Sequence, residues 1–241
     1  MHPITVLNDA GVHNGAIELG VSSALVRDRV DRGENFIVKG IFPESELRAI
    51  RRDFAARYNA TEPCLLEYRW NQRNHWRVDN RPPRSSIPKT LALYFEFTWN
   101  EGHPGFNRIA RMLAALRNDL AGLEPEFGFR EKDDYWVLPV MQHHPRGGGG
   151  INAHADPRKP DGCVISLLMS RRGVDFQSGG VFVEHNGETL DVEGFMGAGD
   201  LLIFRPDTIH GVAPIDPDDE LRFDTDDGRW RMAAVLNPAV R

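Results

Sequence analysis

The sequence has few cysteines and no long apolar segment, and both absences narrow the class of protein. Cys64 and Cys163 are its two cysteines, so at most one disulfide could form and no disulfide framework exists. No apolar run approaches the roughly 20 residues that span a bilayer, and the first residues lack the basic and apolar segments of a secretion signal. We therefore expect a cytoplasmic chain with free thiols and no membrane partner.

Positive charge is also in deficit, because the formal net charge is −6. A general nucleic-acid binder needs a net positive face, so no nucleic-acid partner is expected. Internal repeats, low-complexity segments and a linker are likewise absent from the sequence. The length of 241 residues suits one domain, with residues 1–134 as support and substrate loops and residues 135–241 as the core.

The N-terminal part predicts alternating strands and helices. Residues 36–42 are β-branched and aromatic, which is typical of a strand. Pro43 and two acids then open a helix whose apolar stripe has helical spacing: Leu47, Ile50, Phe54 and Tyr58. Residues 90–98 predict another strand, and residues 106–120 predict a second amphipathic helix.

From Tyr135 onward, short apolar runs alternate with turn signals, the pattern of a β-sandwich or barrel. The runs cover residues 135–141, 163–169, 180–184, 189–192, 200–204, 210–214 and 230–236. Asn186-Gly187 is a strong signal for a two-residue hairpin turn. The expected fold is mainly β with N-terminal helices (α+β), a cupin-like jelly roll buttressed by helices.

Residues 61–88 show neither helical nor strand periodicity, and long aperiodic segments in compact domains tend to be functional loops. Arg69, Arg73, Arg77 and Trp76 lie in this segment, with Arg81 and Arg84 after them. Guanidinium groups could bind a carboxylate or phosphate, and an indole could bind a ring or an apolar chain. Alternatively, this is an arginine-rich loop that packs its aromatic rings on the core, and the sequence leaves both interpretations open.

The strongest chemical signal is His154-Ala155-Asp156, together with a distant His210. On an extended segment, residues two apart point to the same face, so His154 and Asp156 can reach one metal ion. His210 follows a buried strand that could place it opposite His154. Two imidazoles and one carboxylate form the facial triad that leaves open positions on Fe(II).

An isolated His-x-Asp is common by chance, but here it stands in an ordered frame of further motifs. Taken together, these motifs resemble the Fe(II)/2-oxoglutarate-dependent dioxygenases, within them the prolyl-hydroxylase-like group. They are the glycine-rich residues 142–156, Ser178-Gly179-Gly180, Gly199-Asp200, His210-Gly211 and residues 231–235, with residues 36–54 as a strand–helix lead-in. The resemblance covers about residues 36–58 and 135–237 and implies a double-stranded β-helix core.

The resemblance implies roles for matching residues. His154, Asp156 and His210 would bind Fe(II), and an arginine on the last strand would bind the distal carboxylate of the cosubstrate 2-oxoglutarate. Arg231 is the best match, with Arg229 on the same strand face as its rival and Arg222, in an acidic loop, less suitable.

His144 departs from the family pattern, because it stands where many relatives carry a tyrosine that hydrogen-bonds 2-oxoglutarate. Gln142 shares its strand face and is expected to line the same pocket. The other histidines with no ligand spacing are expected at the surface or in loops: His75, His103, His143 and His185.

Asp156 indicates the reaction type, because relatives that halogenate replace this carboxylate with glycine or alanine. Its presence implies hydroxylation, or a related desaturation or ring closure, with O2 consumed and succinate and CO2 released. The loop arginines suggest a small, anionic substrate, for example an amino acid or natural-product intermediate. Two alternatives remain: a Zn(II) or Mn(II) hydrolase or isomerase on the same ligands, and a non-catalytic ligand-binding β-domain.

Overall fold

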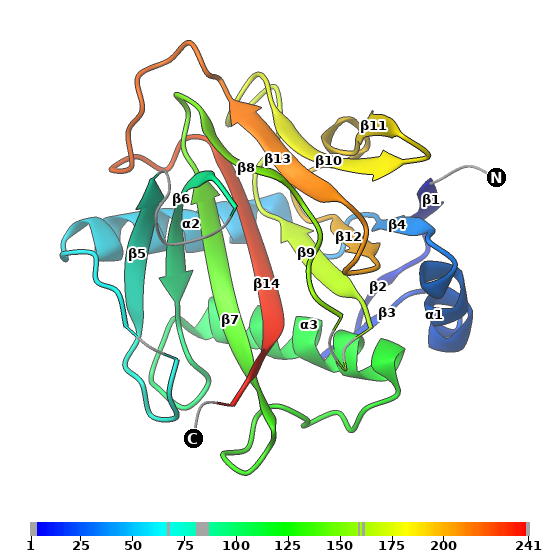
Figure 1. Cartoon of the computed structure of the whole chain (residues 1–241). Coiled ribbons are helices and arrows are strands. Elements are labelled where there is room, and N and C mark those ends of the chain that lie inside the picture. The colour runs from blue at the N-terminus through cyan, green and yellow to red at the C-terminus, as the bar shows by residue number, and fades with distance from the viewer. Residues whose placement is uncertain (1–3, 67, 81–86, 159, 161, 240–241) are drawn as a thin grey trace.

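The computed structural model describes residues 4–66, 68–80, 87–158, 160 and 162–239. Within them the chain is mostly β, as predicted, and the element order is shown in Figure 1. The helices are α1 (Ser23–Asp31), α2 (Glu44–Asn59) and α3 (Pro104–Ala121). The strands are β1 (Ile4–Leu7), β2 (Gly11–His13), β3 (Ala16–Glu18), β4 (Asn35–Val38), β5 (His75–Asn80), β6 (Lys89–Phe95), β7 (Tyr135–His144), β8 (Gly149–His154), β9 (Val164–Leu168), β10 (Gly180–His185), β11 (Glu188–Asp191), β12 (Leu201–Phe204), β13 (His210–Ile215) and β14 (Arg229–Pro238).

One hydrogen-bonded path joins most of the strands in the order β1-β4-β12-β9-β14-β7-β6-β8-β13-β10-β11, with β5 on β6. The path folds over at β6, whose residues 92–95 pair with β7 while Lys89 and Thr90 pair with β8. Two layers result: β5, β6, β7, β14, β9, β12, β4 and β1 form one, and β8, β13, β10 and β11 lie across it. This arrangement fits a jelly-roll core.

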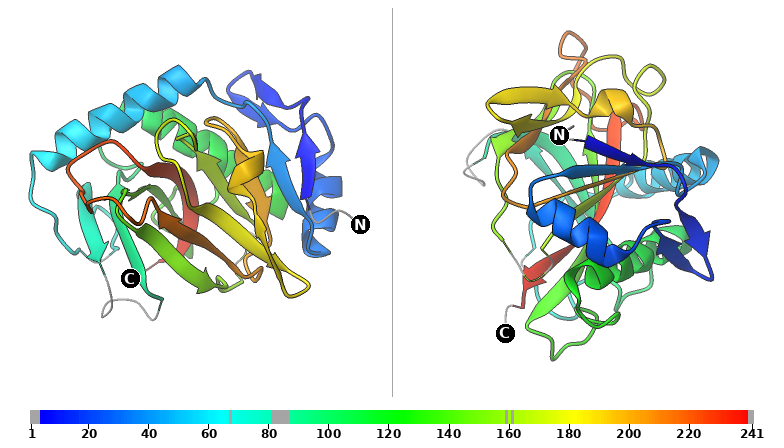
Figure 2. Two further views of the ribbon diagram at one scale, coloured as in Figure 1. Left: turned by 90° about the horizontal axis from the view of Figure 1, so that it is seen from above. Right: turned by 90° about the vertical axis from the view of Figure 1, so that its right-hand side faces the viewer.

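Helices α2 and α3 pack on the outer side of the larger layer, as the view from above in Figure 2 shows. Helix α3 is capped at its start by His103, whose ring accepts a hydrogen bond from the Phe106 N–H, and at its end by Gly122 in the left-handed conformation. Its predicted apolar stripe is buried: Phe106, Ile109, Leu113, Leu116 and Leu120. Among the described residues, no helix is long and apolar enough to cross a membrane.

Most predicted strands lie within a few residues of their observed bounds, and the turn at Asn186-Gly187 joins β10 to β11 with positive φ at both residues. Strands β2, β3, β5 and β8 were not predicted. The glycine-rich segment contains β8, and the supposedly aperiodic residues 61–88 contain β5. In β5, Trp76 and Val78 face the core under the helices while Arg77 lies on the opposite, cavity-lining face, so the alternation typical of a strand is present but is limited to residues 76–79.

Candidate metal centre

His154, Asp156 and His210 come together, with their potential ligand atoms within 4.8 Å of one another. The Nε2 atom of His154 is 3.8 Å from Oδ1 of Asp156, and Nε2 of His210 is 3.8 Å from Oδ2 of the same residue. The two imidazole rings are 4.3 Å apart between centroids. Two imidazoles and one carboxylate in this arrangement could hold one metal ion and leave its other positions open.

Both imidazole rings are oriented for metal binding through Nε2. Nδ1 of His154 lies 2.9 Å from the Asn152 carbonyl oxygen, and Nδ1 of His210 lies 2.9 Å from that of Thr208. A carbonyl oxygen only accepts, so each Nδ1 carries the proton and donates it, which leaves Nε2 as the free lone pair. Burial, and then the nearby His154, lower the pKa of His210 to about 4, which favours the neutral, metal-binding form.

The strand register brings these ligands together. His154 ends β8 and pairs directly with His210, which begins β13. The Asp156 N–H donates to the Pro206 carbonyl oxygen over 2.9 Å, and this bond ties the chain after β8 to the turn before β13. Gly211 allows this close approach, since a Cβ there would lie 2.6 Å from the Phe182 ring and 2.8 Å from the Ile151 carbonyl oxygen.

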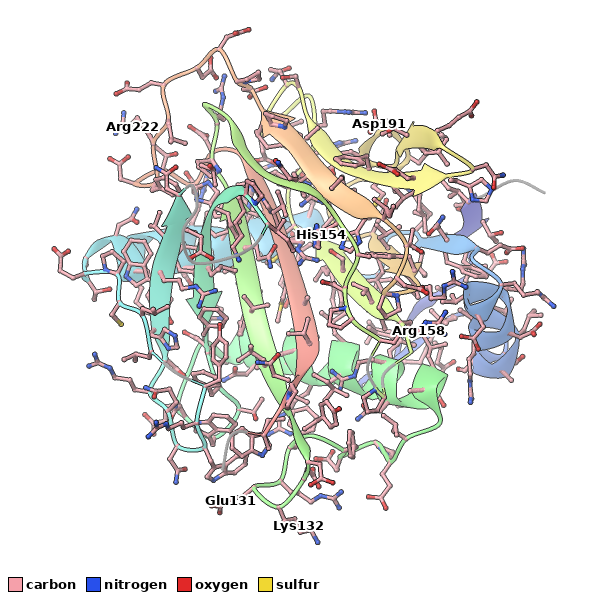
Figure 3. All side chains as sticks on the ribbon, in the orientation of Figure 1. Glu131, Lys132, His154, Arg158, Asp191 and Arg222 are labelled. Carbon is pink, nitrogen blue, oxygen red and sulfur yellow. The ribbon has the colours of Figure 1, made fainter. Side chains whose placement is uncertain are left out.

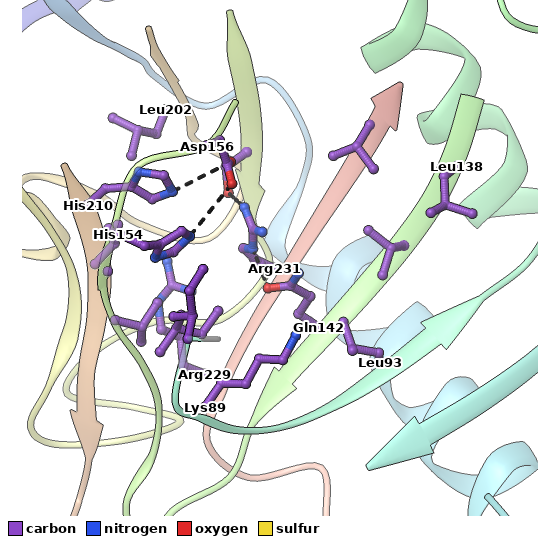
Figure 4. A pocket seen from close by; sticks show the side chains of 18 of the residues that line it. Lys89, Leu93, Leu138, Gln142, His154, Asp156, Leu202, His210, Arg229 and Arg231 are labelled. Atoms are coloured by element: carbon purple, nitrogen blue, oxygen red, sulfur yellow. Dashed lines mark hydrogen bonds and ion pairs between the residues drawn. The ribbon is translucent and has the colours of Figure 1, made fainter. Parts of the chain in front are cut away.

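The triad opens into a cavity of about 300 Å³ between the two layers. Figure 4 shows Arg231 and Gln142 on the larger layer, facing the triad. Apolar side chains form much of the remaining wall, among them Leu93, Phe95, Leu138, Val140 and Val235. Such a site is concave and mostly apolar, with a few convergent polar groups, as is typical of small-molecule sites.

Arg231 is held in the cavity wall by neutral partners. Its Nε donates to Oε1 of Gln142 over 2.7 Å and one Nη donates to Ser166 Oγ over 3.2 Å. Among the described residues, none forms an ion pair with it. Burial, reinforced by the neighbouring Arg229 charge, lowers the pKa of Arg231 to about 10. The Asp156 carboxylate opposes this shift only in part, so the guanidinium lacks a directly paired anion that would compensate its desolvation.

The two rival arginines have carboxylate partners of their own. Arg229 also lines the cavity, but its Nε lies 2.7 Å from Oε2 of Glu193, and both side chains are almost completely buried. Arg222 is exposed and pairs with Asp224 in the loop before β14. Figure 3 places Arg222 at the edge of the molecule, whereas His154 lies near the middle of the view.

Gln142 and His144 are next to these arginines, as their strand face predicts. Gln142 pairs in register with Arg231, and His144 with Arg229. The His144 ring is fully buried, and neither ring nitrogen has a hydrogen-bond partner among the described residues. Burial lowers the pKa of His144 well below its ordinary value, so the ring is neutral. His144 is not among the residues that line the cavity, unlike Gln142, so its contact with 2-oxoglutarate stays a prediction.

Of the four residues predicted to bind substrate, one lies in the cavity wall and three do not. Arg77 lines the cavity, but Arg69 and Arg73 do not. Trp76 points the other way into the core, where it stacks on Tyr94 and donates from Nε1 to Thr61. Arg81 and Arg84 lie outside the described residues.

Two of the histidines expected at the surface are buried. His75 stacks on Phe95. His143 stacks on Trp230 at 4.1 Å between centroids and has its Nε2 2.6 Å from the Asp227 carbonyl oxygen. The burial of these two histidines could not be predicted from residue spacing. Each ring stacks on a residue of a neighbouring strand, and that pairing depends on strand register.

Lys89 and Ser166 are among the polar cavity residues that were missed from the sequence. Extending the alternation of Leu91, Leu93 and Phe95 backwards by one step would have placed Lys89 on the cavity face. Ser166 stands in the middle of an apolar strand, where a polar residue signals a local hydrogen-bond partner.

No protein-family model matches the sequence, and no curated protein matches it significantly. Solved structures do match over most of the chain. A Pseudomonas putida prolyl-4-hydroxylase is 17% identical, with a TM-score of 0.55, over 91% of this chain and 99% of its own. A 2-oxoglutarate-Fe(II) oxygenase family oxidoreductase from Burkholderia pseudomallei is 12% identical, with a TM-score of 0.51, over 91% and 93% of the two chains.

The α-ketoglutarate-dependent epimerase SnoN from nogalamycin biosynthesis is 16% identical, with a TM-score of 0.53, over 90% of this chain and 82% of its own. The chain thus has the fold of 2-oxoglutarate-Fe(II) oxygenases, including prolyl hydroxylases. The resemblance seen in the sequence is confirmed at the level of fold.

Proposed function

We propose that this chain is an Fe(II)- and 2-oxoglutarate-dependent oxygenase that hydroxylates a small molecule. One observation carries the proposal: a two-histidine, one-carboxylate group opens on the same cavity as a desolvated arginine with no carboxylate partner among the described residues. The fold shared with 2-oxoglutarate-Fe(II) oxygenases supports this assignment.

His154, Asp156 and His210 would hold Fe(II), because their free ligand atoms converge and both imidazoles are fixed through Nδ1. With Fe(II) and O2 bound, oxidative decarboxylation of 2-oxoglutarate to succinate and CO2 supplies the oxidant for a substrate C–H bond. The protein contributes geometry and a largely apolar enclosure that limits water.

Arg231 is the residue that we assign to the distal carboxylate of 2-oxoglutarate. Its guanidinium is planar and can donate two hydrogen bonds to a carboxylate. Gln142 and Ser166 orient it without neutralising it, and a carboxylate would compensate the charge that burial destabilises. Arg229 is less suited because Glu193 already neutralises it. His144 and Gln142 provide further polar groups on the same strand face.

Asp156 in the ligand set favours hydroxylation, or a related desaturation or ring closure, over halogenation, since chloride would need the position that this carboxylate occupies. The cavity volume of about 300 Å³ favours a small molecule over a folded protein. A hydrolase or isomerase with Zn(II) or Mn(II) could use the same three ligands, but it would give no role to the carboxylate-free Arg231.

The test is anaerobic addition of Fe(II) and 2-oxoglutarate to the purified chain. We expect a weak visible charge-transfer band that is lost in His154→Ala and kept in His185→Ala, which changes the last residue of β10, outside the triad. Under O2, succinate should form in the wild type. Absence of 2-oxoglutarate binding, together with no succinate on a broad substrate panel, would rule out the proposal and leave the metallohydrolase or ligand-binding alternative.

A further inference from the structure

A second positively charged group lies in the cavity wall, away from the triad. Arg77 on β5 and Lys89 on β6 both line the cavity and share one counterion, Asp79. Lys89 Nζ is 3.0 Å from Asp79 Oδ2, and Arg77 Nε is 3.3 Å from Oδ1. All three side chains are largely buried, with 22%, 19% and 7% of the surface of Lys89, Arg77 and Asp79 exposed.

Arg77 retains capacity to bind an anion. One Nη donates to Asp79 Oδ2 over 3.3 Å, and a guanidinium has five N–H donors, more than this carboxylate uses. Its guanidinium carbon lies 5.6 Å from the centroid of Phe95, whose ring also lines the cavity, so the plane is positioned by an aromatic contact. Lys89 is labelled in Figure 4, where it extends from β6 on the side that carries Gln142 and Leu93.

Arg77 and Arg231 lie on one cross-strand row. Arg231 pairs with Gln142, Gln142 with Leu93, and Leu93 with Arg77. At about 4.8 Å per strand, the three steps separate Arg231 from Arg77 by about 14 Å along the sheet. An anion at Arg77 therefore does not compete with a carboxylate at Arg231, and apolar Leu93 lies between them.

The charges of the cavity leave a positive excess at this second group. Among the described residues that line it, the cations are Arg77, Lys89, Arg229 and Arg231. The acids in the wall or in contact with these cations are Asp156, Glu193 and Asp79. The cations therefore exceed the acids by one charge. Bound Fe(II) and dianionic 2-oxoglutarate carry opposite and equal charges, so together they do not change this excess. Burying an unmatched charge is unfavourable, so a bound monoanion would complete the site.

We propose that the substrate is a monocarboxylate whose carboxylate is bound by Arg77 and Lys89 and whose apolar body lies against Leu93 and Phe95. The inference rests on the proposed function, because the carboxylate anchors the substrate for oxidation at the triad. A phosphate monoester carries close to two negative charges at neutral pH and would overcompensate the site. Lys89 and Arg77 are thus the specificity-determining residues, and Asp79 is the residue that positions them.

The experiment measures binding to the full chain loaded with Zn(II) and saturating 2-oxoglutarate, which keeps other acids away from Arg231. The probes are butanoate, hexanoate, 3-phenylpropanoate and indole-3-acetate, each compared with its primary amide by ligand-observed NMR. We expect at least one acid to bind about tenfold or more tightly than its amide, the difference of one charge-assisted contact. Lys89→Gln and Arg77→Gln should remove this preference, whereas Lys89→Arg and the control Arg73→Gln, outside the cavity, should keep it.

The outcomes separate this inference from the function on which it rests. If 2-oxoglutarate does not bind in the loading step, the proposed function fails. If 2-oxoglutarate binds but no acid is preferred over its amide, or the preference survives Lys89→Gln and Arg77→Gln, the monocarboxylate assignment is overturned. Tighter binding of phenethyl phosphate than of every acid would overturn it as well. Lys89→Gln leaves Arg77 to pair with Asp79, so this variant gives a result even if Arg77→Gln does not fold.

Discussion

His154 and His210 are paired directly across the β8–β13 ladder, and each ring is fixed by a hydrogen bond from Nδ1 to the carbonyl oxygen two residues earlier. Both Nε2 atoms consequently point toward Asp156, at the same distance of 3.8 Å. A one-residue slip of β13 would turn His210 to the opposite face of its strand. The candidate metal site is thus a product of strand register as much as of residue identity.

The first prediction concerns metal binding alone, without any reaction. His210→Ala should weaken binding of Co(II) or Mn(II) by more than about 100-fold, since even losing a group that merely orients a ligand costs about 10- to 100-fold. The control is His185→Ala, which removes an imidazole outside the triad. Titration of the purified variants with Co(II), followed by its visible bands, makes the comparison. Unchanged affinity in His210→Ala would exclude His210 as a ligand.

The second prediction separates Arg231 from Arg229. Arg231→Gln should raise the dissociation constant of 2-oxoglutarate by roughly 100-fold, because a bidentate, charge-assisted contact is lost. Arg231→Lys should fall between the wild type and Arg231→Gln, since an ammonium cannot reproduce the planar fork. Metal affinity should stay near that of the wild type in both variants, and isothermal titration measures both ligands.

Arg229→Gln should instead reduce the free energy of unfolding by about 3–5 kcal/mol, because Glu193 would be left buried and charged without its partner. The matched control is the double variant Arg229→Gln/Glu193→Gln, which removes both charges and should recover much of the loss. If Arg229→Gln folds normally and loses 2-oxoglutarate while Arg231→Gln keeps it, the two roles are reversed.

The fold and the triad could be predicted because they depend on signals that are local in sequence. Short apolar runs between turn signals indicated most strands of the core, and Asn186-Gly187 indicated the hairpin between β10 and β11. The spacing of His154 and Asp156 required only an extended backbone. The pairing of His154 with His210 is a matter of long-range register, which no local pattern encodes.

Strand β5 escaped prediction for a physical reason that also hid part of the candidate site. It pairs with β6 over its whole length, and its cavity-facing side carries Arg77 because the interior of this barrel holds polar groups. Its apolar–polar alternation is limited to residues 76–79 and follows an arginine-rich segment, so the sequence favoured a loop. His143 was misplaced for a related reason: its burial depends on Trp230 across the β7–β14 ladder.

The third prediction uses the burial of His143. Burial lowers its pKa to about 4 in the folded chain, whereas an imidazole in an unfolded chain titrates near 6.5. Between these values the unfolded chain binds a proton that the folded chain does not, so stability is fully present above about pH 6.5 and is lost as the pH falls toward 4. The contribution of this one group is about 3 kcal/mol.

His143→Gln removes the titrating group and keeps a donor for the Asp227 carbonyl oxygen. Its urea-unfolding free energy should therefore change less between pH 7 and pH 4.5 than that of the wild type. His13→Gln, at an exposed position on β2, should retain the wild-type dependence. An unchanged pH dependence in His143→Gln would show that His143 does not contribute to acid destabilisation.

The fourth prediction concerns Trp76 and Arg77, neighbours in sequence that face opposite sides of β5. Trp76 is 7% exposed and stacks on Tyr94, so Trp76→Ala should lower the free energy of unfolding by about 3–5 kcal/mol. Arg77→Gln should cost less stability, because Lys89 still pairs with Asp79, but it should remove the preference for carboxylates. Urea unfolding and the probe-binding assay, run on both variants, distinguish a core residue from a substrate contact. Should Trp76→Ala keep wild-type stability and lose affinity for the acids, the indole would be a substrate contact after all, and the orientation of β5 given above would be wrong.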